Sequence, residues 1–124
     1  MKIISTKTHA VIDYLLGFIM LCVPTMMDFP DDSLVCRTLV IPGLILLLTS
    51  MLSEHEINLA HFFPYQIHLK IDLAIGAFLC LSPMIIGLSQ SVSHLFFGSV
   101  ILANSLLSKK SKNIENSTFN EIQN

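Results

Sequence analysis

Two His–Asp pairs are the residues of this sequence whose types and spacing best suit chemistry. His9 precedes Asp13 by four positions, and His68 precedes Asp72 by the same four positions. An imidazole and a carboxylate can share a proton, form an ion pair or bind a divalent metal. Two of each would suit Zn²⁺, Mn²⁺ or Fe²⁺, provided that the two pairs meet in the folded chain.

Both pairs belong to a longer pattern that occurs twice. In each copy a Gly follows the Asp after four positions, and a Pro follows the Gly after seven. The first copy continues to Gly17 and Pro24, and the second, 59 positions later, to Gly76 and Pro83. The segment after each pair is repeated through matching Gly and Ser positions: Gly43 with Gly98, Ser50 with Ser105, and Ser53 with Ser108. We interpret the chain as a tandem duplication of one helical hairpin.

The composition indicates a membrane protein. Of the 124 residues, 52% are hydrophobic and only 13% are charged, with a mean hydropathy of +0.68, whereas soluble domains carry about 25% charged residues. The net charge of −2 comes without any basic stripe, which excludes a nucleic-acid partner. The three cysteines form no paired motif, so no disulfide framework is expected.

Four apolar runs predict the elements that must position the His–Asp pairs. We expect helices over about 8–27, 35–53, 68–88 and 92–108, each long enough to cross a hydrocarbon core. The fold class is then an all-α membrane protein, with one domain over 1–110. Hairpin repeats at 8–53 and 68–108 are joined by an interfacial linker at 54–67, and 111–124 form a polar, disordered tail. Parallel repeats of this kind are related by a pseudo-twofold axis along the membrane normal.

The distribution of lysines predicts the orientation. Lys2 and Lys7 precede the first helix, and further lysines from Lys109 onward follow the last. Because positive charge is retained inside, both termini and the linker are expected on the cytoplasmic side of the cell membrane. Tyr65 is expected at headgroup depth in the linker.

Helical geometry predicts that the two pairs share the inside of the bundle. Residues four apart lie on one helix face, so His9, Asp13 and Gly17 form one stripe. Gly17 and Gly76, with Gly43 and Gly98 on the second helices, allow helices to approach closely. Pro24 and Pro83 should kink or end their helices.

A polar layer near the cytoplasmic side is the expected result. Its members are His9, Asp13, Thr49, Ser50, His68, Asp72, Asn104 and Ser105. The outer half is expected to be nearly dry, interrupted only by Cys22, Thr25, Cys80 and Ser82, with His94 exposed in the outer loop.

Three interpretations of this layer remain open. Crossed His–Asp pairs could fasten the two halves, they could bind a metal or small polar ligand, or His9 and His68 could be axial ligands of haem. Distances of about 3 Å within each pair favour the fastener, whereas a point about 2.0–2.2 Å from all four side chains favours a metal. Haem is disfavoured because both histidines lie at helix ends, where it would be poorly enclosed.

The middle linker holds a further group of ionisable residues: Glu54, His55, Glu56 and His61. It could be a second metal cluster, but a solvated acidic linker is favoured. No Ser-His-Asp order, glycine-rich phosphate loop or H-E-x-x-H motif is present, so nothing supports a hydrolase or a nucleotide-binding protein.

Over roughly residues 3–110 the chain resembles the SPW-repeat family of small bacterial membrane proteins. The resemblance rests on the His-x3-Asp openings and on Ser82-Pro83 near the end of a repeat's first helix. The family's tryptophan is replaced by Thr25 and Met84 in the two copies. The resemblance implies a four-helix integral membrane protein and implies no activity.

The sequence thus favours a non-enzymatic structural or partner-binding membrane protein. The alternative is a metal- or small-solute-binding or transport protein that uses His9, Asp13, His68 and Asp72. A lipid- or quinone-modifying enzyme with a His–Asp proton relay is a distant third. The bilayer is the expected partner, and the broad apolar surface of so small a bundle would also suit a homo-oligomer.

Overall fold

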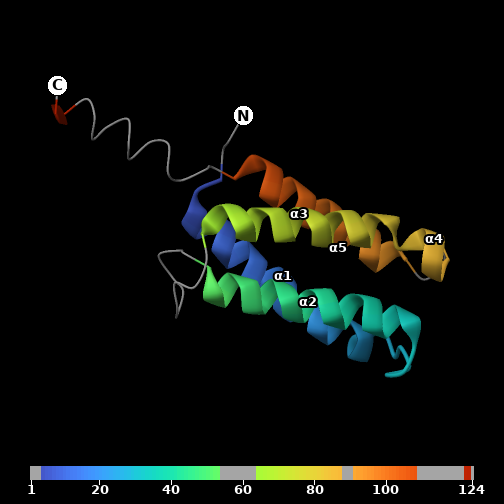
Figure 1. The fold of residues 1–124 in the computed structure, drawn as a ribbon. Helices are drawn as coiled ribbons and strands as arrows, with labels where there is room; N and C mark the ends of the chain where they lie inside the picture. The colour runs from blue at the N-terminus through green and yellow to red at the C-terminus, as the bar shows by residue number, and fades with distance from the viewer. Residues whose placement is uncertain (1–3, 54–63, 88–90, 109–121, 124) are drawn as a thin grey trace.

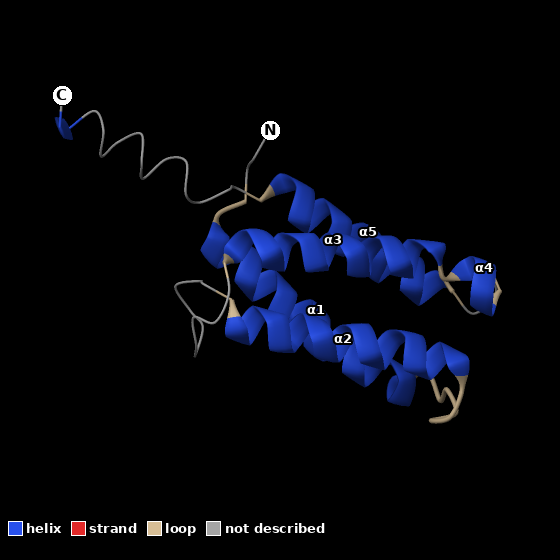
Figure 2. Ribbon diagram, in the orientation of Figure 1, coloured by secondary structure: helices blue, strands red, loops and turns tan. Residues whose placement is uncertain are grey.

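The described part of the chain folds into helices. The computed structural model describes residues 4–53, 64–87, 91–108 and 122–123. Four long helices and one short one follow in chain order (Figure 1): α1 (Thr6–Met26), α2 (Leu34–Leu52), α3 (Tyr65–Leu81), α4 (Pro83–Ile86) and α5 (Val92–Leu107). Figure 2 shows only helices and loops in this part, which confirms the predicted all-α class.

Serine and proline residues set several helix boundaries. Ser5 and Ser33 accept hydrogen bonds from backbone N–H groups in the first turns of α1 and α2, the usual role of an N-cap. The expected helix over 68–88 is corrected in two ways. It begins earlier, at Tyr65, and it is interrupted at Ser82, after which Pro83 starts α4. Proline suits this first helical position because its missing N–H would have no helical partner there. Pro24 lies inside α1, which ends two residues later.

Close glycine contacts hold each hairpin together. Most contacts between helices join α1 with α2, and α3 with α5. A Cβ atom at Gly17 would lie 3.1 Å from the carbonyl oxygen of Gly43, and one at Gly76 would lie 3.1 Å from that of Gly98. The new Cβ atom would also lie 2.7 Å from Leu47 or Leu102, so a larger residue requires these side chains to move, and the glycines allow the paired helices to approach closely.

The bundle carries apolar residues on its outside as well as in its core. All four long helices contribute to a buried cluster: Leu16, Met20, Leu39, Leu46, Ile75, Leu79, Phe97 and Ile101. On the surface, Phe18 is 63% exposed, Ile41 56% and Phe96 62%. Three segments are long and apolar enough to cross a membrane, namely Thr6–Met26, Leu34–Leu52 and Tyr65–Ile86, and α5 is a shorter apolar helix. These features place the chain in the class of helical, multi-pass membrane proteins.

The start of α1 and the end of α5 meet at one end of the bundle. The backbone N–H of Ile4 donates to the carbonyl oxygen of Leu107 at 3.1 Å. The end of α2 and the start of α3 lie at the same end, and α4 lies at the other (Figure 1). The first turns of α1 and α3 are therefore neighbours, and these turns carry the two histidines.

Candidate functional site

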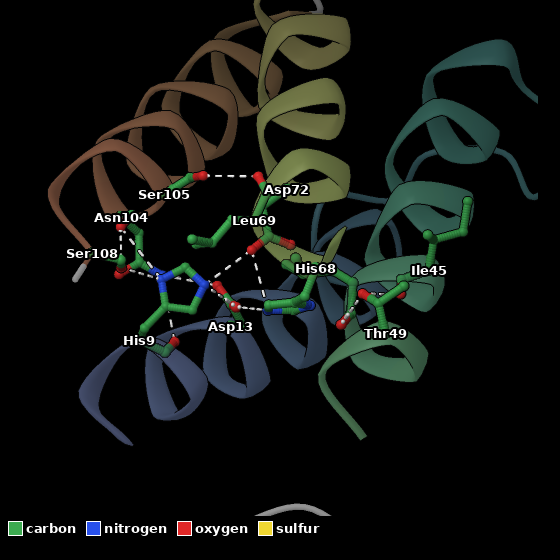
Figure 3. Close-up of polar contacts among 11 residues, drawn as sticks. His9, Asp13, Ile45, Thr49, His68, Leu69, Asp72, Asn104, Ser105 and Ser108 are labelled. Atoms are coloured by element: carbon green, nitrogen blue, oxygen red, sulfur yellow. Dashed lines mark hydrogen bonds and ion pairs between the residues drawn. The ribbon is translucent and has the colours of Figure 1, made fainter. Parts of the chain in front are cut away.

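Four ionisable side chains meet inside the bundle between α1 and α3. His9 and His68 lie in the first turns of their helices, and Asp13 and Asp72 follow one turn later. All four residues are completely buried, with 0% exposure. Figure 3 shows the side chains pointing toward one another, with α5 alongside. The spacing of four residues thus aims each His and its Asp at the same point.

The four side chains form a closed ring in which nitrogen and oxygen alternate. His9 Nε2 lies 3.0 Å from Oδ2 of Asp13 and 3.0 Å from Oδ2 of Asp72. His68 Nε2 lies 2.9 Å from Oδ2 of Asp13 and 3.2 Å from Oδ2 of Asp72. We call these four residues the His–Asp ring. Because each His contacts the Asp of both hairpins, the ring joins the two hairpins.

Helix α5 holds one half of the ring from outside. The Ser108 hydroxyl donates to the carbonyl oxygen of Asn104 at 2.6 Å and lies 2.6 Å from Nδ1 of His9. Because a hydroxyl has one proton, Ser108 accepts from the Nδ1–H of His9. A neutral His9 then presents the lone pair of Nε2 to the ring. Asn104 also donates its amide to Oδ1 of Asp13 at 2.8 Å. Outer bonds of this kind orient the ligands of metal sites.

The carboxylate of Asp72 has less support than that of Asp13. Oδ1 of Asp72 is buried and has no hydrogen-bond partner among the residues that the structure describes. The position that matches Asn104 in the first hairpin is Thr49, whose hydroxyl donates to Ile45 within its own helix at 2.8 Å. The two carboxylates are therefore not equivalent.

Tyr65 covers the ring at the end of the bundle. It is 6% exposed, and its ring meets that of His9 edge-on, with centroids 5.6 Å apart. The expected placement of Tyr65 in a linker is wrong, because the residue begins α3 and packs inward. Its position three residues before His68 places it on the same helix face, which is the signal that could have identified it. Ser108, which bonds His9, was not predicted as part of the polar layer. Its match with Ser53 in the repeated pattern is the signal that could have identified it.

The predicted serines lie close to the ring in different ways. Ser105 donates to the carbonyl oxygen of Leu69 at 3.0 Å and so ties α5 to α3. Ser50 is fully buried, and its hydroxyl has no hydrogen-bond partner in the described ranges. Neither residue is therefore positioned by a bond to an ionisable group of the ring.

The opposite end of the bundle contains a polar contact that the sequence did not predict. His94 has 0% exposure, so its expected place on the surface is wrong. Its Nε2 lies 2.8 Å from the hydroxyl of Thr38, which itself donates to Leu34 at 2.7 Å. Thr38 thus accepts from His94, and this bond joins α2 to α5. The outer half is less dry than expected because the first turn of α5 places His94 on its inner side.

The ring has the dimensions of a metal site. The ring atoms lie 2.9–3.2 Å apart along the four sides, and the ligand atoms of the four residues all lie within 4.8 Å of one another. This spacing is small enough for a single ion between them to contact all four at close to the roughly 2.0–2.2 Å of zinc bonds to nitrogen and oxygen. Haem does not fit, because the carboxylate oxygens occupy the space between the imidazoles. The linker residues Glu54, His55, Glu56 and His61 lie outside the described ranges.

Comparison of the chain with family models, curated proteins and solved structures gives no significant match.

Proposed function

We propose that this membrane protein binds one divalent transition-metal ion in the His–Asp ring. The observation that carries the proposal is the closed, fully buried ring of two nitrogens and two oxygens. Two imidazoles and two carboxylates suit Zn²⁺ first, and Mn²⁺ or Fe²⁺ next. The bonds from Ser108 and Asn104 support the proposal because they orient His9 and Asp13 as ligands.

The ring favours a structural role for the ion over a catalytic one. Four protein donors complete a tetrahedral site, whereas catalytic zinc keeps a position for water or substrate. Each hairpin supplies two donors, one His and one Asp. A bound ion would therefore fasten the hairpins to each other, in keeping with a non-enzymatic protein.

A metal-free fastener is the second candidate, because His9 and Asp13 lie 3.0 Å apart and His68 and Asp72 3.2 Å apart, which are hydrogen-bonding distances and match those expected for a fastener. In this case each Nε2 carries a proton that lies between the two carboxylates. The two candidates differ in the protonation of Nε2 in His9 and His68. A metal needs the lone pair of each Nε2 atom, whereas a fastener needs a proton on each.

Metal analysis of the purified full-length chain separates the candidates. We expect one zinc per chain in the wild type and none after Asp13→Asn with Asp72→Asn. The control is Asp31→Asn, the same substitution in an exposed loop, and it should keep the metal.

One outcome would overturn metal binding, and the stability of the double variant would then decide whether the fastener holds. A wild-type protein without metal, and without a thermal shift when Zn²⁺ is added after chelation, overturns metal binding. If the double variant then unfolds at a lower temperature, the fastener stands. If stability is also unchanged, both candidates fail.

We also propose that the chain belongs with the SPW-repeat proteins it resembles, that its two hairpins are related by a pseudo-twofold axis, and that it lies in a cell membrane with both termini cytoplasmic. Supporting this are the His-x3-Asp repeat, the equal glycine contacts of the hairpins and the lysines near both termini. Single cysteines placed at Lys7 and Asp31 in a cysteine-free background test the orientation. A membrane-impermeant thiol reagent should label only the second one in intact cells, and the reverse pattern would refute the orientation.

A further inference from the structure

A groove of about 350 Å³ lies between α3 and α5, beside the His–Asp ring. Leu69, Leu73 and Leu106 give it apolar walls, and Lys70 and Gln66 lie along it toward the start of α3. Leu73 is 40% exposed and Leu106 64% exposed, so the groove opens on the outside of the bundle. This outer surface faces the acyl chains of a bilayer if α3 spans the membrane.

Lys70 is the charged group of the groove. Its side chain is exposed and makes no ion pair among the described residues, where the ion pairs found are those of the His–Asp ring. Lys70 lies about 7–8 Å along the helix from the start of α3, by the rise per residue. A lysine at this depth extends its stem along apolar surface and places its ammonium at the membrane surface.

The serine hydroxyls of the inner wall are already engaged. Ser105 donates to Leu69, and Ser108 donates to Asn104. The side-chain donors left for a ligand are therefore the ammonium of Lys70 and the amide of Gln66. A cation and an amide at one end of an apolar slot match an amphiphile that has an anionic head and an alkyl chain.

We propose that this groove binds one anionic phospholipid, with its phosphate at Lys70 and Gln66 and an acyl chain along Leu69, Leu73 and Leu106. The cationic rim and the apolar walls together favour a lipid over free phosphate, which would make no use of the leucines. The lipid would lie against Ser108, whose hydroxyl contacts His9 of the ring. The proposal rests on the groove alone and holds whether or not the ring binds metal.

Native mass spectrometry of the full-length protein in detergent tests the groove. With equal amounts of phosphatidylglycerol and phosphatidylcholine, the wild type should retain phosphatidylglycerol preferentially. Lys70→Gln should reduce this preference about fivefold, the value of roughly one basic side chain at a lipid surface. Lys70→Arg should keep it. Lys7→Gln is the matched control, because Lys7 is also exposed but lies outside the groove.

A second variant tests the apolar walls. Leu73→Trp narrows the slot and should reduce the adducts of both lipids, whereas an unchanged lipid count would place the lipid elsewhere and overturn the proposal. Equal retention of the two lipids by the wild type, or an equal loss of preference in Lys7→Gln, would also overturn it. If millimolar inorganic phosphate displaces phosphatidylglycerol completely, the groove is a phosphate site and the lipid assignment is wrong.

Discussion

Replacing Asn104 by leucine isolates one buried hydrogen bond of the His–Asp ring. The Asn104 amide donates to Oδ1 of Asp13 at 2.8 Å, and its second contact, to the backbone oxygen of His9, is long at 3.4 Å. Leucine has a similar size, so the change removes the donor without opening a large cavity. A hydrogen bond to a charged group is worth about 1.5–3 kcal/mol, and an acceptor left buried without its donor costs a similar amount. We expect Asn104→Leu to lower the free energy of unfolding by about 2 kcal/mol.

Reversible unfolding in mixed detergent micelles, after removal of metal, measures this loss. Thr49→Val is the control, since Thr49 occupies the matching position of the first hairpin and, among the described residues, its hydroxyl bonds only carbonyl groups of its own helix. We expect this control to change the free energy by less than about 0.5 kcal/mol. Equal losses in the two variants, or no loss in Asn104→Leu, would refute the idea that Asn104 supports one carboxylate specifically.

Three further predictions concern packing, ligand orientation and metal removal. In Gly98→Ala the new Cβ would lie 2.9 Å from the backbone nitrogen of Cys80. The stability measured by thermal unfolding should therefore fall by about 1–3 kcal/mol. An unchanged melting temperature would contradict the close packing. Ser108→Ala removes the nearer partner of His9 Nδ1, at 2.6 Å, and leaves the backbone oxygen of Asn104 at 3.3 Å. Zn²⁺ affinity measured by chelator competition should therefore fall about 10–100-fold, whereas an unchanged affinity would deny Ser108 its orienting role. Chelation of metal-saturated wild type should remove about 2.7 kcal/mol of stability when the free ion had been at 100 times its Kd. A variant without the two ring carboxylates should show no such loss.

The sequence predicts most of the helical framework because its signals are local. Four apolar runs define the four long helices, of which α5 is shorter than the expected membrane-spanning length, and spacing by four residues places each His and its Asp on one face. Gly17, Gly43, Gly76 and Gly98 lie at the close helix contacts. The helix is interrupted at Ser82, next to Pro83, the residue that was expected to kink or end it, whereas the single helical range of 68–88 was too long.

The connections within the site are less predictable, because they depend on how the hairpins meet. Spacing alone cannot show that His9 contacts Asp72 as closely as it contacts Asp13. Nor does the sequence show that Ser108 bonds His9 across 99 positions of the chain. His94 was placed on the surface because it lies near a predicted loop, whereas its neighbours in the folded bundle bury it. All three cases concern contacts between segments that are far apart in the chain.

The assembly of the ring from both hairpins has a consequence for synthesis of the protein. The helices enter the membrane in chain order, so α1 and α2 are made before α3 and α5. Until the later helices arrive, His9 and Asp13 lack the partners that the finished bundle gives them in Asp72, His68 and Asn104. A chain stopped after its first hairpin would therefore hold two polar groups in hydrocarbon without these contacts. Such a fragment should therefore be less stable in the membrane than the complete chain, so the first hairpin depends on the second for its stability.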